Sequence, residues 1–171
     1  MAANWTDFVA GEVLNASQLN GVVDNFADIA IFNETQTSST AGGTFTSGSY
    51  VKRTLNTTVV NNIAGCSIAS SVITLPAGTF VISASAPAYN VARHQTRIAN
   101  TTASTYSYGE NQYMLTYSSS APVLTTIVLT VSSTIELQHR CSTTVASFGL
   151  GIENAFGTSS VYGSIKIERV A

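Results

Sequence analysis

Charged residues are scarce in this sequence of 171 residues. They make up 9 % of the chain, whereas soluble proteins contain roughly 25 %. Serine, threonine, asparagine and glycine replace them, and hydrophobic residues still account for 44 %. This composition excludes an intrinsically disordered chain, which needs low hydrophobicity and high net charge. It predicts an uncharged polar surface, which is less costly to bury against another protein than an ionic surface is.

Cysteine is also scarce, since Cys66 and Cys141 are the only two. Two cysteines are too few for a disulfide scaffold, and they lack metal-ligand spacing, so free buried thiols are favoured over a disulfide. The sequence has neither a run of about 20 apolar residues nor the pattern of a signal peptide. We therefore expect a protein that folds in a cytoplasm and is not inserted into a membrane.

Residues that could carry catalysis are few. From residue 35 onward there are four glutamates and no aspartate, so the paired carboxylates of glycoside hydrolysis are not expected. The only histidines are His94 and His139. His139 and Cys141 would lie about 7 Å apart on one strand face, which makes them neighbours rather than a catalytic dyad. Metal-binding clusters and phosphate loops are absent as well. We expect no enzyme activity and no cofactor.

The charges are unevenly distributed along the chain. The net charge of −2 argues against nucleic acid as a partner. Residues 1–34 contain five acids and no base, and residues 35–171 contain four acids and all seven bases, which gives side-chain charges of −5 and +3. This asymmetry indicates that the two parts face different environments.

A helical stripe is the clearest feature of the first part. Leu19, Val22, Phe26 and Ile29 are spaced 3, 4 and 3 residues apart, which places them on one face of a helix over residues 16–32. Two heptads cannot sustain a coiled coil alone. The stripe either packs on its own domain or meets copies of itself or a docking partner. We favour the second alternative, because the following segment, 35–44, has the composition of a flexible linker.

After residue 44 the hydrophobic period changes from helical to alternating, as in half-buried strands. Four segments alternate clearly, namely 80–86, 127–131, 135–141 and 161–168. Four weaker candidates are 50–56, 68–75, 93–99 and 113–117. No helical period interrupts these eight or so strands. The pattern excludes βαβ units and predicts an all-β sandwich or barrel over residues 45–171.

Two polar stretches are candidate subunit contacts. Arg93, His94 and Arg97 lie on one expected strand, and His139 and Arg140 lie on another. If these strands are neighbours across a subunit interface, their guanidinium and imidazole groups supply directional hydrogen bonds. The alternative is that these groups lie on solvated faces.

Tyrosine is concentrated in one stretch that is otherwise rich in serine, glycine, asparagine and glutamine. Five of the seven tyrosines fall there, namely Tyr89, Tyr106, Tyr108, Tyr113 and Tyr117. Rigid amphipathic rings among adaptable polar groups are typical of recognition surfaces. We interpret the stretch as a candidate surface for a protein or sugar ligand, with structural tyrosines at strand ends as the alternative.

The opening WTDFVAGEVLNASQLN resembles the start of many bacteriophage tail and fibre proteins. In those proteins an aromatic pair, a glycine and a Leu-x-Ala-x-x-Leu-Asn run lead into a short helix, and the matching positions here are Trp5, Phe8, Gly11, Leu14, Ala16, Leu19 and Asn20. The remainder, including LPAGTFVISASAP, TIELQHRC and VYGSIKIERV, resembles phage virion domains of the jelly-roll type, related in shape to complement globular heads and tumour-necrosis-factor-like trimers.

The resemblance implies an antiparallel jelly-roll homotrimer whose residues 1–34 attach to the virion. The anchor would consist of Trp5, Phe8, Leu14 and Leu19, whose apolar side chains need a pocket in another virion protein. The implied function is a short tail fibre or tail-tip protein that attaches to a host surface glycan or protein. A capsid fibre or decoration protein is the alternative, because the sequence has no long shaft. Either protein would be assembled in the host bacterial cytoplasm.

Overall fold

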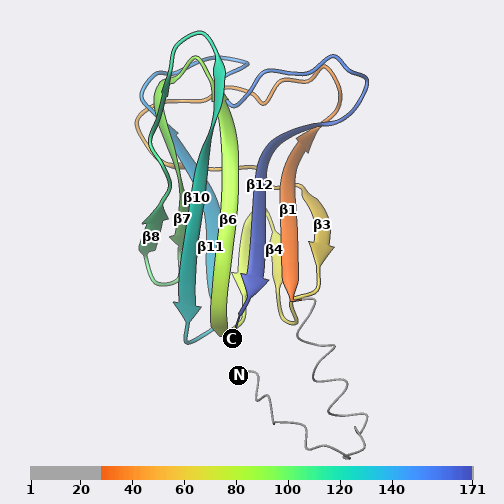
Figure 1. The fold of residues 1–171 in the computed structure, drawn as a ribbon, viewed down its shortest axis with the longest axis vertical. Coiled ribbons are helices and arrows are strands. Elements are labelled where there is room, and N and C mark those ends of the chain that lie inside the picture. The colour runs from red at the N-terminus through yellow and green to blue at the C-terminus, as the bar shows by residue number, and fades with distance from the viewer. Residues whose placement is uncertain (1–27, 171) are drawn as a thin grey trace, which may run out of the picture.

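The computed structural model describes residues 28–170, which form two antiparallel β-sheets packed face to face (Figure 1). The five-stranded sheet contains, in spatial order, β10 (Ser118–Leu129), β6 (Gly78–Tyr89), β12 (Ser160–Arg169), β1 (Ile29–Gln36) and β3 (Thr57–Asn61). The seven-stranded sheet contains β4 (Ser67–Ala69), β5 (Val72–Leu75), β11 (Ser133–Cys141), β7 (Ala92–Asn100) and β8 (Thr105–Tyr108), with β2 (Val51–Lys52) on β11 and β9 (Gln112–Met114) on β7. Within residues 28–170 there is no helix that could cross a membrane.

The apolar residues whose alternation predicts the strands are the ones that the sandwich buries. In β6, Phe80 and Ile82 are fully buried, whereas Ser83 and Ser85 between the inward positions face outward. The all-β prediction is therefore confirmed for the described residues. Twelve strands replace the eight or so that were expected, because several are too short to show a period and because residues 68–75 form most of a tight hairpin, β4–β5, rather than one strand.

The domain begins earlier than predicted. β1 starts at Ile29 and lies between β12 and β3, with Ala30 and Phe32 fully buried. The prediction of a helix is therefore wrong for residues 29–32, and Ile29 is not part of a helical stripe. β12 and β3 supply hydrogen-bond partners for the backbone of this segment. These hydrogen bonds favour a strand in spite of the helical spacing of the side chains. The predicted positions Leu19, Val22 and Phe26 lie outside the described residues.

The predicted linker is also corrected. Thr35 and Gln36 continue β1, and the backbone N–H groups of Gly42 and Gly43 donate hydrogen bonds to the carbonyls of Gly151 and Ser147. Residues 37–44 are thus attached to the loop that precedes β12. Composition suggested flexibility, but hydrogen bonds to residues about one hundred positions away cannot be read from composition.

A buried ion pair joins the two sheets. Arg53, which follows β2, donates from Nε to Glu34 Oε2 of β1 over 2.7 Å, and both residues are at most 2 % exposed. The guanidinium also donates from Nη2 to the carbonyl of Tyr162 at 2.7 Å and to that of Leu150 at 3.3 Å. Desolvation raises the pKa of Glu34 and lowers that of Arg53, while each partner opposes the shift of the other. Glu34 therefore belongs to the β domain and not to an acidic anchoring segment.

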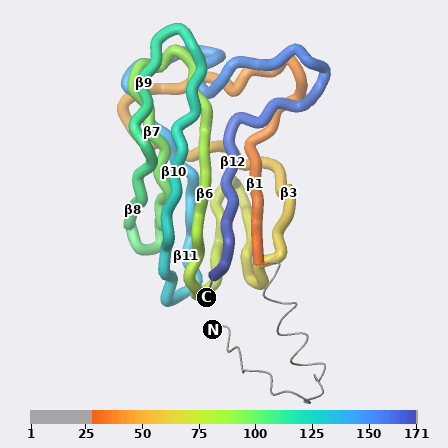
Figure 2. The backbone as a smooth tube through the Cα atoms, in the orientation of Figure 1, coloured from red at the N-terminus to blue at the C-terminus, as the bar shows by residue number. Residues whose placement is uncertain are grey.

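The two ends of the sandwich differ. Ile29 pairs with Glu168, and Arg169 pairs with Phe80 near the start of β6, so the described chain enters and leaves at one end, which we term the proximal end. β6 runs from there to Tyr89 at the opposite, distal end, where long connections cross, as Figure 2 shows. The larger apolar cluster, with Phe32, Phe80 and Ile165, extends from the proximal end, and a small distal cluster contains Phe45, Ala88, Val91 and Cys141.

The buried ion pair generates a stability prediction. Arg53→Met leaves the carboxylate of Glu34 buried without its partner, so we expect the free energy of unfolding to fall by about 3–5 kcal/mol. The double variant Glu34→Leu/Arg53→Met should recover much of this loss, because an apolar pair of similar volume avoids burying charge. Urea denaturation at pH 7 measures all four members of the double-mutant cycle.

A surface ion pair serves as the control. Lys166 Nζ lies 2.7 Å from Glu168 Oε1, and both side chains are more than 40 % exposed. Lys166→Met should therefore lower the free energy of unfolding by less than about 1 kcal/mol. A loss of similar size in Arg53→Met would contradict the importance of the buried pair.

Candidate binding site on the seven-stranded sheet

Strand β7 separates its polar side chains between two faces. Arg93, Gln95 and Arg97 alternate with buried His94 and Thr96, so the first three lie on the outer face of the seven-stranded sheet. Gln95 is opposite Arg140 of β11, and Arg97 is opposite Gln138. The two polar stretches singled out in the sequence are thus neighbours, but within one chain.

Arg97 lies between tyrosine rings. Its Cζ is 3.9 Å from the ring centroid of Tyr50 and 3.8 Å from that of Tyr106. Its Nε donates to Gln138 Oε1 at 2.8 Å, and the ring of Tyr108 lies 6.0 Å from that of Tyr50. Each cation–π contact contributes about 0.5–1 kcal/mol at an exposed site. We term this group the Arg97 stack, and its contacts hold the guanidinium between the two rings.

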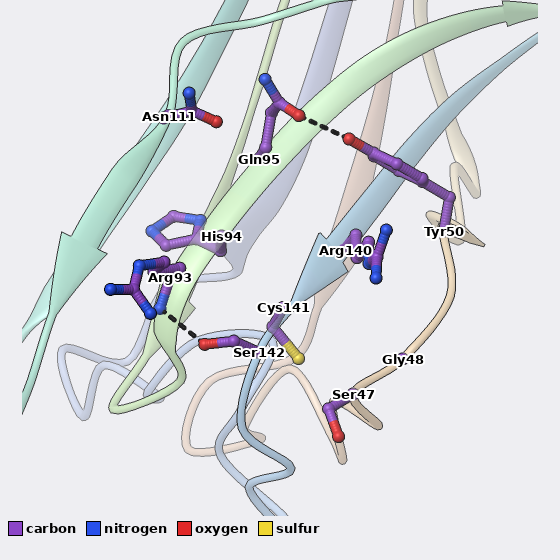
Figure 3. Close-up of a pocket in the computed structure, with 10 residues that line it drawn as sticks. All are labelled: Ser47, Gly48, Tyr50, Arg93, His94, Gln95, Asn111, Arg140, Cys141 and Ser142. Atoms are coloured by element: carbon purple, nitrogen blue, oxygen red, sulfur yellow. Dashed lines mark hydrogen bonds between the residues drawn. The ribbon is translucent and has the colours of Figure 1, made fainter.

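A cleft of about 420 Å³ opens next to Tyr50 of the Arg97 stack, and Figure 3 shows the residues that line it. It lies near the distal end, because β7 begins there and β11 ends there. The cleft is lined by Ser47, Gly48, Tyr50, Arg93, His94, Gln95, Asn111, Arg140, Cys141 and Ser142. The hydroxyl of Tyr50 donates to Gln95 Oε1 at 2.5 Å, and Gln95 Nε2 donates to the carbonyl of Gly109 at 2.8 Å. One wall is therefore fixed by a chain of hydrogen bonds.

Two arginines border the cleft without a carboxylate partner among the described residues. Arg93 and Arg140 are exposed, and their Cζ atoms lie 5.8 Å from the ring of Tyr113 and 5.9 Å from that of Tyr50. Glu136, on the same face, accepts from Gln138 Nε2 at 2.7 Å and lies 3.9 Å from Lys52 Nζ. Two positive charges without a described carboxylate partner therefore lie beside the cleft.

A histidine pair lies behind the cleft. His94 Nδ1 is 2.9 Å from His139 Nε2, and His94 Nε2 is 2.7 Å from Ser119 Oγ. Burial lowers the pKa of His94 to about 4, and burial together with the charge of Arg53 holds the pKa of His139 well below its ordinary value. Both rings are thus neutral at pH 7. His139 is completely buried within one chain, so its assignment to a subunit interface is wrong.

The serine and the two histidines have the order of nucleophile, base and orienting group, but their electrostatics oppose catalysis. A general base must become an imidazolium, which a carboxylate usually stabilises. Here His139 takes the place of the carboxylate, and the nearby positive charge of Arg53 disfavours protonation. His94 instead links Ser119 and His139 between the sheets, and Nδ1 of His139 is buried without a hydrogen-bond partner among residues 28–170.

Both cysteines are free thiols, as the sequence predicted. Burial raises the pKa of each thiol to about 11. Cys141 Sγ donates to the carbonyl of Thr143 at 3.3 Å. The thiol at the base of the cleft is therefore protonated at neutral pH and is a poor nucleophile. No group of three His, Cys, Asp or Glu side chains that could hold a metal ion occurs in the described part of the chain.

The tyrosine-rich stretch does not form one surface. Tyr106 and Tyr108 belong to the Arg97 stack and Tyr113 lies beside Arg93, but Tyr89 ends β6 in the other sheet and Tyr117 lies in the connection between β9 and β10. Sequence reasoning missed Tyr50 as a site residue, because it lies apart from the tyrosine-rich stretch, after a serine- and glycine-rich segment and at the start of the weak strand candidate 50–56. The anchor residues Trp5, Phe8, Leu14 and Leu19 lie outside the described residues.

The arrangement of the sheets is that of a jelly roll of the complement-head type. The globular domain of zebrafish complement 1qA is similar with a TM-score of 0.54 and 10 % identity, over 85 % of this chain and 98 % of that chain. At that identity the likeness shows the fold alone, and it confirms the jelly roll that the sequence resemblance implied.

Two further solved structures have lower scores. Murine APRIL at pH 8.5 gives a TM-score of 0.49 with 8 % identity, over 82 % of this chain and 97 % of that chain. The PRD1 vertex protein P5 gives 0.48 with 13 % identity, over 84 % and 97 %. No protein-family model matches the sequence, and no curated protein matches it.

The histidine pair generates a prediction about pH. Because the folded-state pKa of His94 is about 4 and the ordinary value is 6.5, the unfolded chain binds more protons between these values. The free energy of unfolding should therefore fall as the pH decreases from 6.5 to 4, by about 3 kcal/mol from His94. The double variant His94→Asn/His139→Asn contains no histidine and should lose this part of the pH dependence.

Urea midpoints at pH 7, 5.5 and 4.5 measure the effect as a slope, which is independent of any constant destabilisation in the variant. The acidic groups titrate in both proteins, so their contribution cancels in the comparison. Equal slopes in the two proteins would show that the histidines are not buried in their neutral form.

Proposed function

We propose that this protein is a structural component of a bacteriophage virion, a short trimeric fibre or tail-tip protein that attaches the particle to its host. The observation that carries the proposal is the separation of the two ends of the domain. The described chain enters and leaves at the proximal end, and the cleft opens near the distal end. A domain held through the residues before Asp28 presents its cleft away from the support. The resemblance of WTDFVAGEVLNASQLN to phage fibre proteins supports the proposal that this support is a virion.

In this proposal the protein acts by binding and assembly rather than by catalysis. The neutral Ser119–His94–His139 chain lacks the negative charge that stabilises an imidazolium, and the thiol of Cys141 is protonated at neutral pH. The outer face of the seven-stranded sheet combines ordered tyrosines with exposed guanidinium groups, which is a composition suited to recognition.

The outer face of the five-stranded sheet is the surface that we assign to subunit contacts in a homotrimer. One cross-strand row consists entirely of uncharged residues, namely Pro122, Ser85, Ser164, Asn33 and Thr57. From β10, Leu124 and Val128 project with 73 % and 71 % of their surface exposed. Lys166 and Glu168 of β12 also lie on this face, but they pair with each other, so burying the face would remove aliphatic surface from water around one ion pair.

A charge placed on this face tests the trimer. Leu124→Glu should leave the domain folded, because the side chain is exposed in the single chain, but should shift the protein from trimer to monomer at micromolar concentration through desolvation of the carboxylate. Sedimentation velocity measures the state. Val131→Glu, in the turn after β10, is the matched control and should remain trimeric. A monomeric wild-type protein at that concentration would contradict the assignment.

Removal of residues 1–27 tests the anchor. The larger apolar cluster and the buried ion pair both lie within residues 28–170, so the truncated protein should unfold within a few degrees of the full chain, as circular dichroism would show. It should nevertheless fail to join particles when it is supplied in place of the full protein. Incorporation at the normal level would show that the attachment lies elsewhere.

Electron microscopy of intact particles decides between the two positions. Density for the protein at the tail tip supports host attachment. Density distributed over the capsid would favour the head fibre or decoration protein, and loss of particle stability in its absence would then be expected.

A further inference from the structure

We infer that the distal cleft binds an acidic sugar unit, one that bears a carboxylate or a phosphate, from a polysaccharide on the host surface. This inference rests on the proposed function in host attachment and specifies the chemistry of the ligand. It is carried by the juxtaposition of two unpaired guanidinium groups, a fixed tyrosine ring and uncharged hydrogen-bonding groups around one hollow.

The guanidinium groups of Arg93 and Arg140 can reach one anion together. The backbone N–H of Ser142 donates to the carbonyl of Arg93, and Arg140 faces Gln95, so the two arginines occupy diagonal positions on adjacent strands. Diagonal residues lie roughly 7–8 Å apart at their backbones, well within the reach of two arginine side chains. Arginine binds carboxylate and phosphate in a bidentate manner, and no described carboxylate occupies either group.

The other basic groups on this face are already engaged, which locates the anion at the distal end. Arg97 is held between the rings of Tyr50 and Tyr106 and donates to Gln138. Lys52 donates to the carbonyl of Ser70 at 2.7 Å and lies near Glu136. Four of the seven bases therefore lie on one face, and Arg93 and Arg140 are the two whose charge remains available beside the hollow.

The wall formed by Tyr50 suits a sugar ring. Its hydroxyl is fixed by Gln95 and its ring by Arg97, so little conformational entropy is lost when a ligand packs on it. The volume of about 420 Å³ lies in the range of small-molecule sites and exceeds what a free anion needs. Asn111, Ser47 and Ser142 add neutral donors and acceptors that can bind sugar hydroxyls.

Isothermal titration calorimetry of the full-length protein tests the inference with three probes of equal length. These are a glucuronate-containing oligosaccharide, a glycerol-phosphate oligomer and a neutral glucan. We expect at least one acidic probe to bind on the order of tenfold or more tightly than the neutral probe, and its affinity to fall with rising salt. Preference for the first or second acidic probe identifies a carboxylate or a phosphate as the bound group.

Variants assign the binding to the cleft. Arg93→Gln/Arg140→Gln should weaken binding of the acidic probe on the order of tenfold or more, since each charge-assisted contact is lost. Arg169→Gln removes one charge at the proximal end, remote from the cleft, and should change the affinity less than threefold at physiological salt. Equal loss in the double variant and in Arg169→Gln, or no preference of the wild-type protein for an acidic probe, would overturn the inference.

Binding to host cells separates this inference from the proposed function. If the full protein binds cells and Arg93→Gln/Arg140→Gln binds them equally well, the attachment function stands and the cleft is not its site. If the acidic probe binds through the two arginines but the protein neither reaches the virion nor binds cells, the site stands and the proposed function fails.

Discussion

The buried pair of Glu34 and Arg53 is the contact on which much of the architecture depends. It connects β1 of one sheet to the segment after β2 of the other. The guanidinium is almost fully buried, so water does not replace the carboxylate as its partner. Its bonds to the carbonyls of Tyr162 and Leu150 extend the constraint to β12 and to the loop before it. A buried ion pair adds little net stability over an apolar pair. Its value here is positional, because it holds Glu34 of β1 against the segment that follows β2.

The ion pair belongs to a polar layer that continues across the interior. The ring of Phe45 lies 4.6 Å from that of His139, and the histidine pair leads to Ser119 on β10. This layer separates the larger apolar cluster from the small distal one. The cleft lies over this layer, and His94 lines it. The hydrogen bonds of His94 in the interior therefore help to fix the shape of the cleft.

Sequence periodicity predicted the strands whose two faces differ clearly in polarity. It failed where the same residues also fit a helical spacing. β6, β11 and β12 alternate clearly, and the structure confirms them. β1 was missed because Ile29 also fitted a helical spacing, and only the neighbouring strands β12 and β3 decide between the two. The sequence grouped Arg93, His94 and Arg97 as one candidate contact, whereas the structure places the arginines and His94 on opposite faces of β7. Tyr50 could not be assigned, because its partners come from strands far away in the sequence.

Two arginines of β7 have different roles, since Arg97 is stacked between tyrosine rings and Arg93 is free to bind a ligand. Their separation along the strand explains this difference. Arg97 lies four residues, about 13 Å, from Arg93, and β8 pairs beside it so that Tyr106 and Tyr50 enclose its guanidinium. β8 ends at Tyr108, opposite Arg97, and only β9 reaches Arg93, through Tyr113 at a longer range. Stacking therefore holds the guanidinium of Arg97 and leaves that of Arg93 free. The free charge consequently lies at the end of the domain remote from the entry of the chain, where a ligand in solution can reach it.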